Sequence, residues 1–400
     1  MLKNKGINLS ALSVLVPLIF QLLYVRYVSY EVDKKIFADF VILSTFIYGF
    51  SQVFLSIPGQ AFSRFYNATK DKLYFINEFR TYLLGINLLS IVVVFGFYFL
   101  YKDRFDLSIY IAIYFILALF NNYSLNQQIF LMSLERGRHL VLKIFEAAAK
   151  YIFPLLVYYH FQTLQSFVGG ILLGYAISSI FLFYYLRDKP FKIELNFQNQ
   201  KKYFLFAYPI MIAAIASWTI AFSDRYFIDY YLSKEELAIY AILAQLSGFA
   251  QVLGAVYGTY VNPIILKSYE ENHTIGLRLL KKYLWNFLFI LLLITLLVFA
   301  LPRSLFVIFI EEAVISNQYY YHTFIILVIG IALSVFQTAI SIYFVLLKKL
   351  KIHAIIFLLA SAVNLSLNFL IPEYGIIMAA ISTFSAYFLI NLLTFWYIRS

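Results

Sequence analysis

Apolar runs of membrane-spanning length follow one another along most of the chain, with short polar segments between them. A transmembrane helix needs about 20 mostly apolar residues. By this measure the pattern predicts twelve spans, at about 8–29, 36–57, 79–100, 107–132, 140–160, 163–186, 203–231, 236–265, 283–302, 320–347, 352–371 and 374–398. The apolar stretch within 302–318 is too short to cross a bilayer, and we expect it to lie at the membrane interface. The fold class predicted is an all-α polytopic membrane protein.

The composition supports a membrane protein and argues against several other classes of protein. The chain is 63% hydrophobic and 13% charged, whereas soluble domains are about half apolar and about a quarter charged. It has no cysteine, so neither a disulfide nor a thiolate metal site can form. The five histidines include no pair at metal-ligand spacing, and no P-loop, GxSxG or HExxH motif occurs. We expect no metal, no cofactor and no enzymatic activity, and transport driven by a gradient or by the cargo.

The positive charges are distributed unevenly between alternate loops. With the N-terminus inside, 21 of the 31 lysines and arginines fall in inner segments, six in outer segments and four within spans. This bias predicts that both termini are cytoplasmic. It also accounts for most of the net charge of +11, so no nucleic-acid partner is required. The first span is too long for a signal-peptide core, and we expect it to be retained.

The longest inner connection divides the spans into six and six, which predicts lobes at 1–190 and 203–400 joined by a linker at 191–202. The halves resemble each other at an offset of 199, where Arg26-Tyr27 matches Arg225-Tyr226 and Gln52-Val53 matches Gln251-Val252. An even number of spans in each half gives a parallel repeat. Such repeats are typical of transporters with a central cavity between two lobes.

Charge inside a bilayer costs about 2.5 to 3.5 kcal/mol at a helix centre, so such residues should face a cavity or a partner. Lys150 lies near the middle of its span, and Lys143 and Glu146 share its helical face. Pro154 disrupts the helix and frees the carbonyl of Lys150. Two interpretations remain open: a polar cavity lined by a cation, or a Glu146–Lys150 pair that neutralises itself.

A second group of charged residues lies toward the outer ends of spans. It comprises Arg26, Asp39, Asp224, Arg225 and Asp229. Long side chains at this depth can reach the headgroups. This pattern favours a network of Arg and Asp that latches the lobes, although contact with cargo remains an alternative.

Amides within the spans add polar candidates, although amides also hydrogen-bond between transmembrane helices. The candidate substrate-binding residues are Lys150, Arg26, Lys143, Arg64, Asn121, Asn122, Gln52 and Gln251. The candidates for ion coupling or gating are Glu146, Asp39, Asp224, Arg225 and Asp229.

The stretch NLSLNFLIPEYGIIMAAISTFSAY, from Asn364 to Tyr387, resembles the C-terminal signature of polysaccharide flippases. The Tyr208-Pro209 pair and Asp224-Arg225-Tyr226 resemble the start of that family's second half. The chain is therefore similar to O-antigen flippases of the Wzx type. These belong to the multidrug/oligosaccharidyl-lipid/polysaccharide (MOP) exporter superfamily, which includes the MATE transporters. The resemblance implies two six-helix lobes around a central cavity with alternating access.

The resemblance also implies a function. A flippase of this type moves an undecaprenyl-diphosphate-linked oligosaccharide across the bacterial inner membrane, and polysaccharide polymerase and chain-length proteins would be its partners. Cations such as Lys150 and Arg26 would suit the diphosphate. Coupling to H⁺ or Na⁺ would involve carboxylates such as Glu146 and Asp39.

Three alternatives remain. A multidrug or cation antiporter of the same superfamily needs an unpaired carboxylate in the cavity, but the first span carries Arg26 and no acid. A peptidoglycan-precursor flippase would resemble chains with fourteen spans. A membrane-embedded polysaccharide polymerase or ligase usually needs a long outer loop with catalytic residues, and none is predicted here.

Overall fold

The computed structural model describes residues 2–66 and 69–399; Met1 and Ser400, which end the two predicted lobes, lie outside this range. The described residues form helices and contain no strand. Eleven of these helices are long and apolar enough to cross a membrane. The prediction of an all-α polytopic membrane protein is confirmed.

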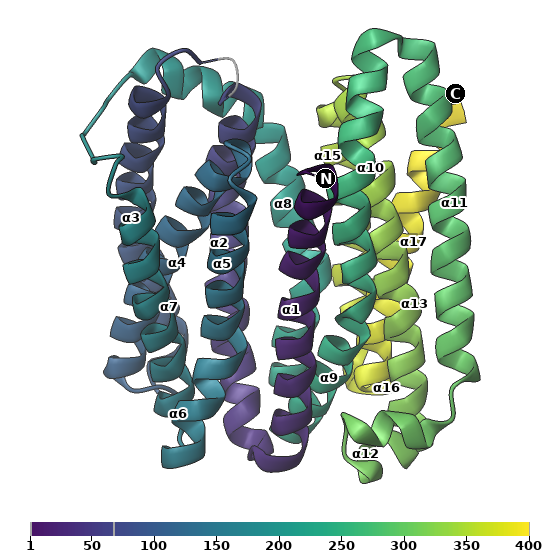
Figure 1. Cartoon of the computed structure of the whole chain (residues 1–400). Helices are drawn as coiled ribbons and strands as arrows, with labels where there is room; N and C mark the ends of the chain where they lie inside the picture. Colours follow the sequence, from purple (N-terminus) through teal and green to yellow (C-terminus); the bar gives the residue numbers. More distant parts are fainter. Residues whose placement is uncertain (1, 67–68, 400) are drawn as a thin grey trace. The chain divides into compact units, whose positions relative to one another are not determined.

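The chain forms two compact units, and the first comprises Met1–Tyr24 and Ile42–Ala214. Its helices include the first part of α1 and most of α2, and end with the first part of α8. Their bounds are α1 Leu2–Glu31, α2 Lys34–Phe65, α3 Lys72–Tyr101, α4 Leu107–Met132, α5 Arg136–Ala147, η1 Ala148–Ile152, α6 Phe153–Phe161, α7 Leu164–Leu186 and α8 Phe197–Tyr231. Within this unit α3 packs on α4, and α7 packs on α4, α5 and α6 (Figure 1).

The predicted span 140–160 is not one regular helix. It falls on the consecutive elements α5, η1 and α6, in which η1 is a turn of π-helix. Pro154 follows directly, at the start of α6. Pro154 has no amide hydrogen and cannot donate to the carbonyl four residues before it. The helix is therefore interrupted here by one wider turn, the π-turn, and not by a separate loop.

The second unit comprises Val25–Val41 and Ile215–Ser400. In it α17 packs along α13 and α15, and α10 packs along α11 (Figure 1). The bounds are α9 Lys234–Ser247, η2 Gly248–Ala250, α10 Gln251–Glu271, α11 His273–Ala300, η3 Arg303–Ile308, α12 Glu312–Ser316, α13 Gln318–Ile340, α14 Ile342–Leu346, α15 Leu350–Asn368, α16 Ile371–Tyr374 and α17 Ile376–Arg399. The region 302–318 thus holds two short helices, neither long enough to span.

Helix boundaries repeat at an offset of 200 residues. α1 ends at Glu31 and α8 at Tyr231, while α2 begins at Lys34 and α9 at Lys234. The residues that cap the following helices also correspond, because Asp33 accepts from the amide of Ile36 at 3.0 Å and Ser233 accepts from the amide of Glu236 at 3.1 Å. These matches support the internal repeat. The lobe boundaries at 190 and 203 stay a prediction.

The stretch that carries the flippase resemblance forms a polar network inside the second unit. Asn364 and Asn368 are fully buried on α15, and the Nδ2 of Asn364 donates to the hydroxyl of Ser382 on α17 at 3.2 Å. The Nδ2 of Asn368 donates to the hydroxyl of Ser223 on α8 at 3.1 Å. These asparagines therefore join three helices.

The turn between α16 and α17 requires glycine. Gly375 has a φ of +70°, and a Cβ there would lie 2.2 Å from the hydroxyl of Tyr319. That hydroxyl donates to the carbonyl of Tyr374 at 3.0 Å and accepts from the amide of Ile377 at 3.2 Å. The Tyr-Gly of the signature is thus explained by backbone geometry.

Candidate functional site

Lys150 lies in the π-turn and is surrounded by aromatic rings. Its Nζ is 4.6 Å from the ring centroid of Tyr48 on α2 and 5.2 Å from that of Tyr151. The ring of Tyr24, on α1, lies 5.6 Å from that of Tyr151. A lysine over ring faces is attracted by their quadrupoles, and each such contact contributes about 0.5–2 kcal/mol depending on desolvation.

The neighbouring helix holds the π-turn in place through small residues. A Cβ at Gly170 of α7 would lie 2.5 Å from the Cα of Pro154, and one at Gly174 would lie 2.6 Å from the Cα of Ala149. Such spacing of small residues lets helix backbones approach closely in membranes. The hydroxyl of Ser178, one turn further, donates to the carbonyl of Phe145 at 3.1 Å. The sequence therefore positions Lys150 through the close packing of α7.

The carboxylate nearest in sequence is paired with a different cation. Glu146 accepts from the Nζ of Lys143 at 2.7 Å. Among residues 2–66 and 69–399, no carboxylate lies within ion-pair distance of the Nζ of Lys150. Of the two interpretations of this span, the geometry thus favours a separate cation over a Glu146–Lys150 pair.

The remaining polar candidates of the first unit lie in different environments. Asn121 on α4 is fully buried, and within the described part of the chain its side-chain amide has no hydrogen-bond partner. The side-chain amide of Asn122 donates to the carbonyl of Ala118 at 2.7 Å, which is a hydrogen bond within the same helix. Gln52 and Arg64 are exposed on α2. Of the four candidates Asn121, Asn122, Gln52 and Arg64, only Asn121 is buried with its amide unused.

Arg26 contacts the short helix η3. Its Nη1 donates to the carbonyl of Ile308 at 2.8 Å, and the guanidinium lies 5.8 Å from the ring of Tyr30. The hydroxyl of Tyr30 donates to the carbonyls of Val307 and Ile310. In the second unit Arg26 therefore helps to fix this non-spanning segment. Gln251, the first residue of α10, is exposed.

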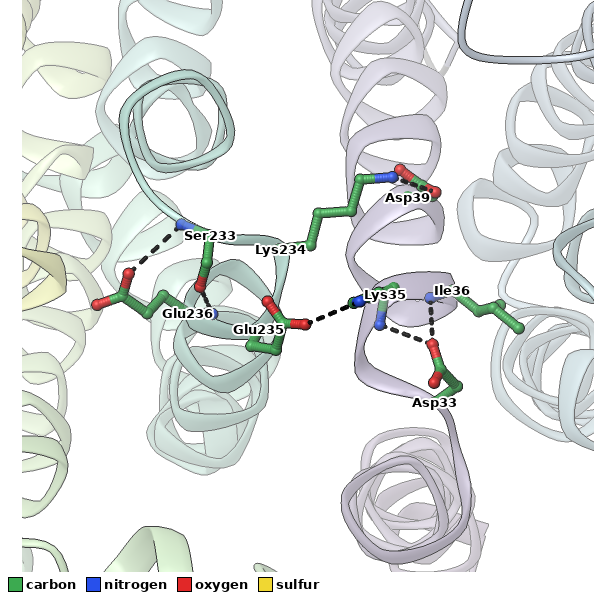
Figure 2. Close-up of polar contacts among 8 residues, drawn as sticks. All are labelled: Asp33, Lys35, Ile36, Asp39, Ser233, Lys234, Glu235 and Glu236. Atoms are coloured by element: carbon green, nitrogen blue, oxygen red, sulfur yellow. Dashed lines mark hydrogen bonds and ion pairs between the residues drawn. The ribbon is translucent and has the colours of Figure 1, made fainter.

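Asp39 belongs to a group of ion pairs between the starts of α2 and α9. The Nζ of Lys234 lies 2.9 Å from Oδ2 of Asp39, and the Nζ of Lys35 lies 3.7 Å from Oε1 of Glu235 (Figure 2). Lys34 pairs in addition with Glu311 at 3.2 Å. These pairs join segments of the second unit that are far apart in sequence. The role of Asp39 in a latch or in cargo contact stays a prediction.

Asp224 is a buried carboxylate held by hydroxyl groups. It is 2% exposed, and its Oδ2 accepts from the hydroxyl of Tyr240 on α9 and, at 3.5 Å, from that of Thr383 on α17. Its Oδ1 accepts from the amide of Arg225 at 2.8 Å. The cluster is therefore a buried carboxylate whose oxygens accept from two hydroxyls and one amide, so its burial is compensated by hydrogen bonds.

The other two candidates lie on the same helix. The guanidinium of Arg225 lies 4.6 Å from the ring centroid of Phe222, one turn before it. Asp229 is half-buried near the end of α8. The structure thus spreads the sequence-predicted residues over several places rather than gathering them in one.

Two charged residues at the start of α3 were not among the sequence-based candidates. Glu78 is 2% exposed and accepts from Nδ2 of Asn199 at 2.9 Å and from the hydroxyl of Tyr203 at 3.2 Å. Arg80 donates to Oδ1 of Asn126 at 2.8 Å. Glu78 directly precedes the predicted span 79–100 and Arg80 lies in its first turn, so a position near the interface was expected for both. The signal in the sequence that could have identified them is a pair of opposite charges, two residues apart, beside an apolar run.

The comparisons with known proteins identify the class to which this chain belongs. A family model described as "Polysaccharide biosynthesis protein" matches residues 4–269, and the chain belongs to this family. No curated protein matches the chain.

Solved structures of transporters share the fold. A lipid II flippase, MurJ, in an inward closed conformation is similar with a TM-score of 0.75 at 15% identity, covering 99% of this chain and 87% of that one. An inward-facing multidrug resistance MATE transporter of the MOP superfamily has a TM-score of 0.68 at 12% identity, covering 98% and 93%. A MOP superfamily transporter from Pyrococcus furiosus has a TM-score of 0.64 at 13% identity, covering 99% and 95%. The chain is therefore a multi-pass membrane protein with the MOP fold.

Proposed function

We propose that this protein is a flippase that moves an oligosaccharide linked to undecaprenyl diphosphate across the bacterial inner membrane by alternating access. Its termini would lie in the cytoplasm, and its partners would include polysaccharide polymerase and chain-length proteins. Membership of the polysaccharide biosynthesis family and the likeness to a lipid II flippase support this class of cargo.

The observation that carries the proposal is the environment of Lys150. This ammonium lies inside the predicted span 140–160 against the rings of Tyr48 and Tyr151, without a carboxylate within ion-pair distance among the described residues. A charge in that position is costly, and its retention is explained if an anion binds there during transport. A diphosphate provides such an anion, and the aromatic rings offer surfaces for a sugar.

The rival function is a multidrug or cation antiporter. Such a transporter needs an available carboxylate beside its cargo. Near Lys150 the carboxylate of Glu146 is already held by Lys143 at 2.7 Å. This arrangement favours an anionic cargo in the first unit.

The test is a deletion strain complemented with variants. Deletion should remove surface polysaccharide and cause lipid-linked repeat units to accumulate on the cytoplasmic side. Lys150→Ala should fail to restore export at normal protein level, whereas Lys150→Arg should restore part of it. A deletion strain that is sensitive to cationic drugs but has normal polysaccharide would instead establish the antiporter function.

For coupling we propose Asp224, because its carboxylate is buried among the hydroxyls of Tyr240 and Thr383. Asp224→Asn removes the titratable group while keeping an oxygen acceptor. The variant should fold and should lose the dependence of transport on the ion gradient. Gradient-dependent transport at the wild-type rate would exclude Asp224 from coupling.

A further inference from the structure

A cavity of about 390 Å³ lies in the first unit, at one end of the bundle formed by α3, α4 and α7. Its polar wall consists of Arg80, Asn122, Asn126, Arg187 and Lys189. No residue of the π-turn lines it, so it is separate from the surroundings of Lys150. Ligand sites for small molecules typically have volumes of about 300–1,000 Å³, and this cavity falls in that range.

The wall presents three cations and, among the residues that line the cavity, no carboxylate. Arg80 is held in a defined position, since its Nε donates to Asn126 at 2.8 Å and its Nη1 donates to the carbonyl of Lys189 at 2.8 Å. Across the described residues, its Nη2 makes no hydrogen bond. A fixed guanidinium with one unused amino group is suited to bind an anion.

Two carboxylates lie close by, and both pair with cations of the wall. Glu135 is 2.7 Å from the guanidinium of Arg138 and only 3.9 Å from the Nζ of Lys189. Asp188 is exposed, at 3.9 Å from the Nε of Arg187. The Arg187–Asp188 pair is exposed and contributes little, whereas the Lys189–Glu135 pair is half-buried and offsets part of the charge of Lys189. Arg80 forms no ion pair among the described residues. The cavity therefore keeps an excess of positive charge.

The position of the cavity along the helices matches the depth of lipid headgroups. Arg80 lies eight residues after the start of α3, and Asn126 lies six residues before the end of α4. At 1.5 Å per residue, both are within about 12 Å of the helix ends. Arg187 directly follows the last residue of α7. The cations thus lie between the apolar spans and the polar connection.

Apolar side chains border the same cavity. Leu84 is 42% exposed, Phe183 is 66% exposed and Phe191 is 50% exposed. A soluble anion would make no use of these surfaces. A phospholipid would use both parts, with its phosphate against the cations and its acyl chains against the apolar residues.

We infer that this cavity binds the phosphate of an anionic membrane phospholipid. The inference does not depend on the proposed flippase function, because its cations are not those of the Lys150 site and its ligand is a lipid of the surrounding bilayer; Asn122 is the one substrate candidate in the wall.

The test uses the purified full chain in detergent, titrated with phosphatidylglycerol or with zwitterionic phosphatidylcholine, and reads bound lipid by native mass spectrometry. Phosphatidylglycerol should bind more tightly than phosphatidylcholine. The double variant Arg187→Gln/Lys189→Gln should bind phosphatidylglycerol at least about ten-fold more weakly, since hydrogen bonds to charged groups are lost. The matched control Lys192→Gln/Lys201→Gln removes the same charge from exposed residues outside the cavity and should bind as the wild type does.

A second arm separates a lipid from a free anion. Inorganic phosphate is titrated at constant ionic strength against the complex with phosphatidylglycerol, and it should not displace the lipid. Equal loss of binding in the lining and control variants would overturn the inference, as would displacement by inorganic phosphate alone. Thermal unfolding of each variant without lipid verifies that it is folded.

Discussion

Lys150 and Asp224 are two charged residues inside the predicted spans 140–160 and 203–231, and their surroundings differ in kind. Lys150 lies on a π-turn and faces the rings of Tyr48 and Tyr151. Asp224 lies on a regular part of α8 and accepts hydrogen bonds from the side chains of Tyr240 and Thr383 and from the amide of Arg225. Aromatic faces offset only part of the desolvation of a cation, whereas three donors satisfy most of a carboxylate.

Asp224 is thus satisfied by its neighbours, which does not exclude a role in coupling, whereas Lys150 has no carboxylate within ion-pair distance among the described residues. A group that is satisfied by its neighbours stabilises the folded chain, and its loss leaves donors without acceptors. A group that lacks an opposite charge is a cost to the fold, so its retention indicates a function. Substitutions at the two residues and in the packing around them distinguish these two situations.

The largest effect should come from the packing that holds the π-turn. Gly174→Ala places a Cβ 2.6 Å from the Cα of Ala149, so backbone must move, and we expect a loss of about 2 kcal/mol or more in the free energy of unfolding. Gly169→Ala is the matched control, because a Cβ there meets nothing within 4 Å. It should be neutral or stabilising. Unfolding in detergent measures both, and equal stability of the two variants would refute the role of Gly174.

Asp224→Ala should destabilise the second unit by about 2 kcal/mol, because buried hydroxyls of Tyr240 and Thr383 lose their acceptor. Asp224→Asn keeps an oxygen acceptor and should lower the free energy of unfolding by less than Asp224→Ala does. The comparison of the two unfolding midpoints isolates the hydrogen bonds from the charge. Identical midpoints for Asp224→Ala and the wild type would show that the carboxylate does not serve the fold.

Lys150→Met should change the free energy of unfolding in the opposite direction to Asp224→Ala. It removes a desolvated charge and leaves a flexible apolar side chain, so the free energy of unfolding should stay equal or rise by about 1 kcal/mol. Transport should be lost at the same time. A clear fall in stability would contradict the comparison, because it would show that the ring contacts alone satisfy the ammonium.

The smallest effect should come from the exposed pairs at the start of α2. Lys35 is 68% exposed and 3.7 Å from Glu235, so Lys35→Gln should change the free energy of unfolding by less than about 0.5 kcal/mol. Lys234→Gln should cost slightly more, since its pair with Asp39 is shorter, at 2.9 Å, and less exposed. Added salt should reduce both effects. A larger loss in the free energy of unfolding for Lys35→Gln would contradict this prediction, because it would show that the exposed Lys35–Glu235 pair stabilises the fold.

Much of the fold could be predicted from the sequence. Runs of apolar residues define spans because backbone polar groups in a bilayer must bond within the helix, and this physical rule needs no tertiary information. The offset near 200 between Arg26 and Arg225 predicted a repeat, and the ends of α1 and α8 recur at that spacing. Pro154 correctly located the interruption of its span.

The candidate site could be predicted less well. The sequence placed Lys143, Glu146 and Lys150 on one helical face, but it could not decide which cation pairs with the carboxylate. The π-turn changes the register between Glu146 and Lys150, and the structure pairs Glu146 with Lys143. Glu78 and Arg80 escaped notice because their burial arises from segments more than 40 residues away in the chain.

The class of protein, the approximate spans and the residues whose charge is costly in a membrane could all be predicted from the sequence alone. These follow from composition and local periodicity, because the partition of a segment between water and lipid depends on its own residues and not on the fold. Only the tertiary structure decided which of those charges is satisfied. Gly174 lets α7 approach the π-turn, Tyr48 turns a ring toward Lys150, and Tyr240 donates to Asp224. Such contacts depend on helix rotation and close packing, which no local pattern encodes.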